Sequence, residues 1–195
     1  MIFSSIVIDC LRSKYENEDV GIAYFYFEHA ESQAQTPAFF ARAMLRQLSS
    51  QIGGLIPSAV SDFYQRTKND VRDQAWFLEL QGVLHRVAST FSQCFFVIDA
   101  FDETDARDHR AGLLEVLTNL RLRAKCRIFA STRPHIQNVE KAFDGSMISN
   151  VSADSTDLET FLSSLIDSHP DAEYLMDGQL KAEIITKLCE NSRGM

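Results

Sequence analysis

Three carboxylates lie within five residues near the middle of the chain, at Asp99, Asp102 and Glu103. They follow the apolar run FFVI at 95–98, which predicts a strand buried on both faces of a sheet. Ligands of open α/β sheets bind at the carboxyl ends of such strands. Placing three carboxylates close together there costs electrostatic free energy, unless they bind a cation or take part in a reaction. The pattern therefore predicts a magnesium–phosphate site, and the alternative is an acidic, solvated loop.

A second predicted strand end carries hydroxyl and guanidinium groups. Residues 126–131 predict a short strand, and Pro134 favours an extended conformation just before it. In a parallel sheet this end would point into the same crevice as the acids, since adjacent strands lie about 5 Å apart. Ser131, Thr132 and Arg133 would then face phosphate oxygens while the acids serve a cation. The alternative for Arg133 is a salt bridge with one of the acids.

Helical and strand patterns alternate along the rest of the chain. We expect strands at 20–27 and 147–151, and helices at 2–14, 37–51, 58–68, 73–88, 108–122, 136–143, 155–167 and 178–190. Expected helix caps are Thr36, Asp73 and Asp177. The buried stripe of the first helix is expected at Ile2, Phe3, Ile6 and Cys10, flanked by Val7 and Leu11. This alternation predicts a mostly parallel sheet wrapped by helices.

Composition narrows the classes of function. The formal net charge of −8 argues against a general nucleic-acid-binding surface, which needs a basic face. No apolar run approaches the roughly 20 residues that span a membrane, and the first residues lack a basic signal-peptide region. The four cysteines are far apart and form no CxxC pair, so we expect reduced thiols in a cytoplasmic chain and no structural zinc.

Three segments resemble one known family. Residues 95–103 (FFVIDAFDE) resemble the extended Walker B motif of NACHT NTPases, and residues 128–134 (IFASTRP) resemble their sensor 1 strand. Residues 20–27 (VGIAYFYF) resemble the second strand of the fungal, nephrocystin-like branch. In that branch the NACHT module precedes ankyrin, WD40 or similar repeats in signalling proteins. The resemblance extends over nearly the whole chain.

The resemblance implies a three-layer P-loop NTPase fold and a nucleotide switch that uses Mg²⁺ with ATP or GTP. Asp99 would hold Mg²⁺ through water, and Asp102 and Glu103 would position or activate the hydrolytic water. Arg133 would sense the γ-phosphate, with Ser131 and Thr132 beside it. The implied partners are a nucleoside triphosphate and proteins, including further copies of the chain, and the implied location is the cytoplasm.

The phosphate-binding loop GxxxxGK[ST] occurs nowhere in the 195 residues. Met1 stands about where the Ser or Thr of that loop would be, so the resemblance implies a fragment that lacks the N-terminal strand and the loop. We expect a truncated nucleotide-binding core at 1–151 and a helical extension at 152–195. Because the loop supplies most of the triphosphate affinity, the chain by itself is expected to be inactive. The alternatives are a non-catalytic interaction remnant of the fold and an unrelated Mg²⁺-dependent phosphohydrolase.

Overall fold

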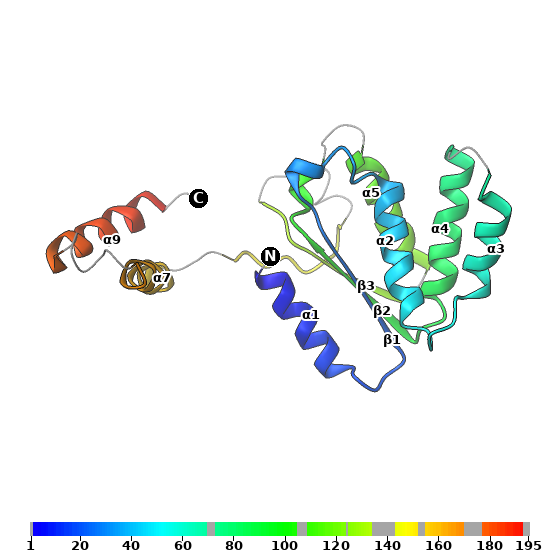
Figure 1. Cartoon of the computed structure of the whole chain (residues 1–195), viewed down its shortest axis with the longest axis horizontal. Helices are drawn as coiled ribbons and strands as arrows, with labels where there is room; N and C mark the ends of the chain where they lie inside the picture. The colour runs from blue at the N-terminus through cyan, green and yellow to red at the C-terminus, as the bar shows by residue number, and fades with distance from the viewer. Residues whose placement is uncertain are drawn as a thin grey trace. The chain divides into compact units, whose positions relative to one another are not determined.

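The first of the chain's two structural units, residues 1–144, is built on three parallel strands. They are β1 (Val20–Tyr26), β2 (Gln93–Asp99) and β3 (Cys126–Ala130), in the order β1-β2-β3 (Figure 1). This computed structural model describes residues 2–69, 73–104, 109–123, 125–133, 143–151, 155–169 and 177–192. The prediction of a parallel sheet with the acidic strand in the middle is confirmed.

Helices flank the sheet, as expected for an α/β fold. α1 (Ile2–Lys14) lies on one side, and α2 (Pro37–Ser50), α4 (Gln74–Ala88) and α5 (His109–Arg123) lie on the other (Figure 1). α3 (Ser58–Thr67) packs on α4, where Phe63 and Trp76 bring their ring centroids to 5.7 Å. Two short 3₁₀ turns, η1 (His29–Glu31) and η2 (Phe101–Glu103), follow β1 and β2. A three-stranded sheet flanked by helices is therefore the observed architecture of this unit.

Two of the helix starts follow directly from local sequence. The Thr36 hydroxyl accepts a hydrogen bond of 3.2 Å from the Phe39 amide, and Pro37 occupies the first turn of α2. Asp73 accepts one of 3.0 Å from the Trp76 amide at the start of α4. Each cap satisfies an amide that has no partner within its helix. Both predicted caps are confirmed.

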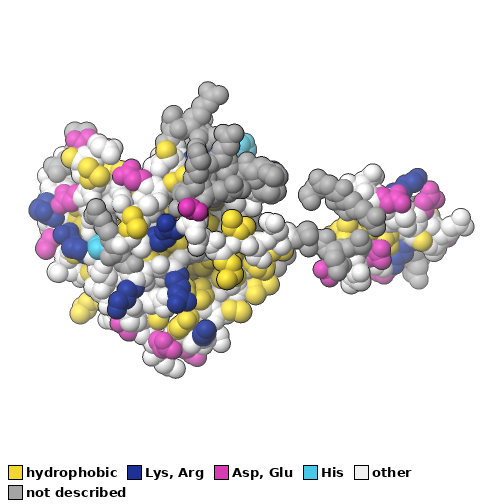
Figure 2. All heavy atoms as spheres, turned by 180° about the vertical axis from the view of Figure 1, so that it is seen from behind, with side chains coloured by type: hydrophobic (Ala, Val, Ile, Leu, Met, Phe, Trp, Pro, Cys, Tyr) yellow, Lys and Arg dark blue, Asp and Glu magenta, His cyan; other side chains and the backbone are white. Residues whose placement is uncertain are grey.

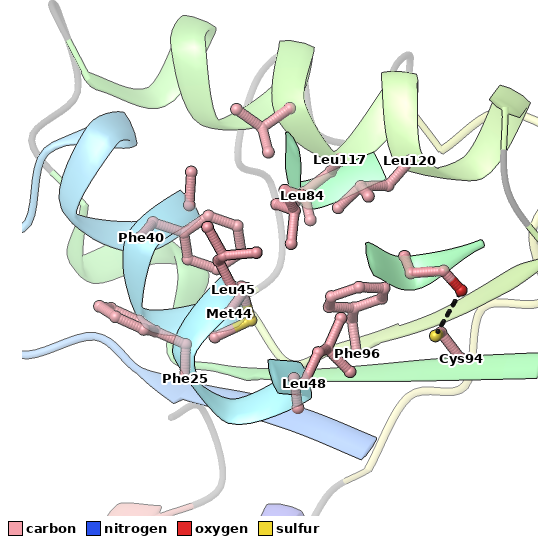
Figure 3. Close-up of a cluster of buried hydrophobic side chains, with 14 of the residues drawn as sticks. Phe25, Phe40, Met44, Leu45, Leu48, Leu84, Cys94, Phe96, Leu117 and Leu120 are labelled. Atoms are coloured by element: carbon pink, nitrogen blue, oxygen red, sulfur yellow. Dashed lines mark hydrogen bonds between the residues drawn. The ribbon is translucent and has the colours of Figure 1, made fainter. Parts of the chain in front are cut away.

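The hydrophobic core lies between the sheet and the α2, α4 and α5 layer. β2 is buried at every position after its first, which fits a central parallel strand. Figure 3 shows the side chains that meet there: Phe25, Phe40, Met44, Leu45, Leu48, Leu84, Phe96, Leu117 and Leu120. Gly21 permits this packing, because a Cβ there would stand 2.8 Å from Leu48 and 2.9 Å from the Cys94 sulfur. The core therefore holds α2 close against β1.

The predicted buried stripe of α1 is wrong at Phe3, Ile6 and Cys10, which are exposed, whereas its predicted flank, Val7 and Leu11, is half-buried. Phe3 and Ile6 have 51% and 54% of their surface exposed, whereas Ser4 and Ile8 are buried against the sheet. The segment offers apolar residues on several sides of the helix, so hydrophobicity alone does not choose the buried face. A hydrogen bond from Ser4 to a carboxylate of β2 accompanies the observed orientation.

The second unit, residues 145–195, contains the helices α7 (Ser155–Asp167) and α9 (Gly178–Ser192). Lys181 and Asp167 join them by an ion pair of 2.6 Å, and the predicted cap Asp177 accepts a 2.7 Å hydrogen bond from the Leu180 amide. The predicted strand at 147–151 is wrong, because this segment is exposed and has no regular structure. Without a neighbouring strand, so short an apolar run has no ladder to stabilise it. The predicted helix at 136–143 lies almost wholly outside the described residues.

Candidate functional site

The chain turns sharply after β2, and this turn carries the carboxylates. Ala100 adopts the left-handed conformation (φ 53°, ψ 47°), which costs a non-glycine residue on the order of 1 kcal/mol or more. Its amide donates a 3.0 Å hydrogen bond to the Ser131 hydroxyl, and the Phe101 amide donates one of 2.9 Å to the Ser131 carbonyl. These bonds hold the turn and tie the end of β2 to the end of β3.

Asp99, the last residue of β2, accepts two hydroxyl hydrogen bonds on a single oxygen. The Ser4 hydroxyl lies 2.5 Å and the Ser131 hydroxyl 2.7 Å from its Oδ1 atom. The side chain is 5% exposed, and burial by itself raises the pKa of a carboxyl group. The pKa of Asp99 nevertheless lies below its ordinary value of 3.8, because the positive amino terminus of the chain, followed by the Ser4 and Ser131 hydroxyls, stabilises the ionised form more than burial destabilises it. Asp99 is therefore a buried, ionised carboxylate.

Asp102 pairs with Arg133 at the same edge of the sheet. One carboxylate oxygen lies 3.2 Å from the Arg133 Nε, and the other accepts a 3.1 Å hydrogen bond from the Arg133 amide. The Asp102 side chain is only 10% exposed, whereas that of Arg133 is 78% exposed. The predicted proximity of acid and arginine is confirmed, in the form of the salt bridge that the sequence left as an alternative.

Glu103 and Thr132 have other partners. Glu103 Oε2 accepts a 2.9 Å hydrogen bond from the His29 amide in η1, which joins the end of β1 to the acidic turn. The Thr132 hydroxyl donates to the carbonyl of Arg133 at 3.3 Å. The three predicted acids therefore share one edge of the sheet, but each is bound to a different neighbour.

Sequence reasoning missed two residues of this site, Ser4 and Arg110. Arg110, near the start of α5, donates to the Asp102 carbonyl at 3.2 Å and to the Thr104 hydroxyl and carbonyl at 3.1 and 3.0 Å. It thereby fixes the backbone of the acidic turn. No motif indicates Arg110, but a serine inside an apolar helical segment, as at Ser4, could have suggested an inward polar contact.

The arrangement offers oxygen atoms but no preformed metal cluster. Among the residues that the structure describes, no three His, Cys, Asp or Glu side chains are grouped to hold a metal ion. Two hollows found on the described surface lie along α7 and beside α3, and neither is lined by the acids or by Arg133. No described helix is long and apolar enough to cross a membrane.

The comparison with protein families covers the whole of this site. Residues 1–133 match the family model described as Nephrocystin 3, N-terminal. The chain belongs to the nephrocystin 3 N-terminal family. The matched segment of this nephrocystin-type chain runs from α1 through all three strands to Arg133. No curated protein and no solved structure matches the chain. The expected nephrocystin-like relationship is thus confirmed.

Proposed function

We propose that this nephrocystin-type chain is the core of a NACHT-type nucleotide switch, acting in the cytoplasm as part of a signalling protein. One observation carries the proposal: adjacent parallel strands bring Asp99, Asp102 and Glu103 to the same sheet edge as Ser131 and Arg133. Carboxylates at that edge suit a cation, and hydroxyl and guanidinium groups suit phosphate oxygens. Binding and hydrolysis of ATP or GTP would then bias the protein between two states.

Each residue has a role in this proposal. Asp99, ionised and hydrogen-bonded to two hydroxyls, would hold Mg²⁺ through a water molecule. Asp102 and Glu103 would orient the hydrolytic water, while Ser131, Thr132 and Arg133 would face the phosphates. The ligand atoms that the carboxylates offer at this edge are oxygens, which Mg²⁺ requires, so the residues present fit the ion. Bound Mg²⁺ would neutralise charge on the phosphates during hydrolysis.

The Arg133–Asp102 pair suggests how the switch would work. The guanidinium of Arg133 is largely exposed, so the ion pair contributes at most about 1 kcal/mol to the free energy of unfolding. A triphosphate could therefore draw Arg133 away from Asp102 at little cost and release that carboxylate toward water. Loss of the γ-phosphate would restore the pair.

A different class of function, a non-catalytic interaction module, is favoured by three other observations. The acids and Arg133 are bound to one another or to neighbouring groups, two hollows of the described surface lie along α7 and beside α3 instead, and the sequence lacks GxxxxGK[ST]. In that case the carboxylates would be structural, since they tie β1, β2 and β3 together.

Titration calorimetry separates the two functions. The 195-residue chain is expected to bind Mg·ATP and Mg·GTP weakly or not at all, because the phosphate loop supplies most of the affinity. A fusion that adds an apolar strand and GxxxxGK[ST] before Ile2 should bind one of them with micromolar affinity, about −8 kcal/mol. Asp99→Asn should weaken that binding about 10–100-fold, whereas the exposed control Asp62→Asn should not.

Two results would change the conclusion. A fusion that folds but binds neither nucleotide would establish the interaction module in place of the switch. Micromolar binding by the unextended chain would mean that another segment replaces the phosphate loop.

A further inference from the structure

Two cysteines stand directly opposite each other near the starts of β2 and β3. The register of the sheet pairs Cys94 with Cys126, and the Cys94 amide donates a 3.0 Å hydrogen bond to the Lys125 carbonyl. Adjacent strands lie about 4.8 Å apart, and a disulfide needs Cα atoms about 4.4–6.8 Å apart. The backbone therefore already holds the two cysteines at a separation that a disulfide can bridge.

Both side chains lie on the same face of the sheet. The Cys94 sulfur is buried in the core, and Figure 3 shows its 3.3 Å hydrogen bond to the Ala88 carbonyl at the end of α4. Cys126 is half-buried and packs against the same core. Neither cysteine is in a disulfide. Cys10 is exposed on α1, which covers the other face of the sheet (Figure 1), so within the first unit the two thiols have only each other as neighbours.

The start of β3 is accessible to a small oxidant. Lys125 and Arg127, the neighbours of Cys126 in the chain, are both exposed, and Cys126 itself is partly so. Figure 2 shows Lys and Arg side chains exposed among apolar ones on one face of the first unit. Cys94, by contrast, has no exposed surface. An oxidant that comes from solvent therefore meets the Cys126 sulfur first.

The contact between the thiols favours the reactive form of Cys126. A thiolate, and not a thiol, is the nucleophile in oxidation. The pKa of Cys126 lies below its ordinary value of 9.0, because the Cys94 thiol donates a hydrogen bond to its sulfur and this effect exceeds that of burial. The same contact, together with burial, raises the pKa of Cys94. Cys126 is therefore the attacking thiol of the pair, and Cys94 is the resolving thiol.

We propose that hydrogen peroxide converts Cys94 and Cys126 into a disulfide that joins β2 to β3. The Cys126 thiolate attacks one peroxide oxygen, and the O–O bond breaks to give a sulfenic acid and hydroxide, which takes up the proton that Cys126 released. The Cys94 sulfur then attacks the Cys126 sulfur. The S–S bond forms as the S–O bond breaks, and the Cys94 proton leaves with that oxygen as water. Two thiols are thus oxidised while one peroxide is reduced to two waters.

The disulfide would act at a distance from the candidate site. It would close the loop of residues 94–126, which contains η2 and α5, and such a closure restricts the unfolded chain. Asp99 and Ser131 lie at the opposite ends of the same strands. The oxidised chain is therefore expected to keep its site and to unfold at a higher urea concentration, and a thiol reductant should reverse the change. This inference does not rest on the proposed function.

Peptide mapping of the full 195-residue chain tests the pair without any substitution. The chain is treated with hydrogen peroxide, its remaining thiols are alkylated, and trypsin digests it without reduction. Cleavage after Lys and Arg places Cys94 in peptide 87–107 and Cys126 in the dipeptide 126–127. We expect these two peptides to be joined, and to separate when a reductant is added. Alkylated Cys94 beside a Cys126 oxidised to its sulfinic acid, or equal linkage to Cys10, would overturn the proposal.

Two variants test the order of the steps and the effect of the bond. In Cys94→Ala the Cys126 sulfenic acid should accumulate and be captured by dimedone, whereas Cys10→Ala, the matched exposed control, should form the disulfide as the unmodified chain does. Circular dichroism checks that Cys94→Ala is folded, and the peptide map stands if it is not. Dimedone capture that is equal in the folded Cys94→Ala and control proteins, or a urea midpoint of the control that oxidation leaves unchanged, would contradict the proposal.

Discussion

At the scale of the residue, the main finding is one carboxylate shared between two hydroxyls from distant parts of the chain. Ser4 and Ser131 converge on the same oxygen of Asp99, and they join α1, β2 and the end of β3. Such bonds stabilise the ionised form of a buried carboxyl group and are stronger than bonds between neutral groups. The residues of the site therefore contribute to the stability of the fold, whether or not the site binds nucleotide.

Asp99→Asn should destabilise the chain by about 1–3 kcal/mol near neutral pH, because the hydroxyls lose a charged acceptor. The pKa of Asp99 is lowered in the folded protein, so its stabilising effect is present above the ordinary value of 3.8 and disappears as the pH falls through the folded value. Melting curves of both proteins from pH 7 to pH 3 check this. A gap between the melting temperatures that stays constant over this range would contradict it.

At the scale of the element, the two edges of the sheet differ because of what lies beside them. Gln47 of α2 and Gln51, which caps the C-terminus of that helix, lie one turn apart, and each bonds one outward-facing residue of β1, Tyr24 and Ile22 respectively. β3 contacts α5, but among the described residues no side chain bonds its outward peptide groups as the glutamines bond those of β1.

Replacing both Gln47 and Gln51 with alanine should expose the peptide groups of Ile22 and Tyr24 at the β1 edge. The variant is then expected to self-associate more than the unmodified chain, detected by sedimentation velocity, since an exposed strand edge can pair with another chain. Gln65→Ala with Gln81→Ala, which removes two glutamines outside the sheet edges, provides the control. An unchanged size distribution in the Gln47, Gln51 variant would mean that the glutamines do not protect the edge.

At the scale of the whole molecule, the proposed function implies a further strand beside β3. A strand supplied ahead of α1 would bond the outward peptide groups of β3. Each buried backbone group without a partner costs about 1–3 kcal/mol, so several together rival the 5–15 kcal/mol that stabilises a domain. A strand that bonds this edge is therefore expected to change the free energy of unfolding more than any single side chain does.

The fusion that carries an apolar strand and GxxxxGK[ST] should melt at a higher temperature than the 195-residue chain, even without nucleotide. Calorimetry at one low protein concentration, with a fusion of equal length but polar Gly/Ser composition as the control, provides the measurement. Equal melting temperatures of the three proteins would show that the sheet needs no further strand.

The sequence by itself determined the three strands of the sheet, two helix caps of the first unit and the meeting of Asp102 with Arg133. These follow from local rules, since apolar runs, capping side chains and the shared edge of parallel strands need no knowledge of distant packing. Which face of α1 is buried against the sheet was decided only in the tertiary structure. Its segment is apolar on several sides, and only the folded chain brings Asp99 to Ser4.

The closing of β1 by Gln47 and Gln51 was likewise decided by the tertiary structure. The local sequence around these glutamines does not predict that they bond a strand edge, because that contact depends on how closely α2 approaches β1 over Gly21. The failed strand at 147–151 has the same origin, since a strand exists only where another strand pairs with it. Local pattern therefore determined the helices of the first unit and the strands of its sheet, and packing between distant segments decided which faces and edges they present.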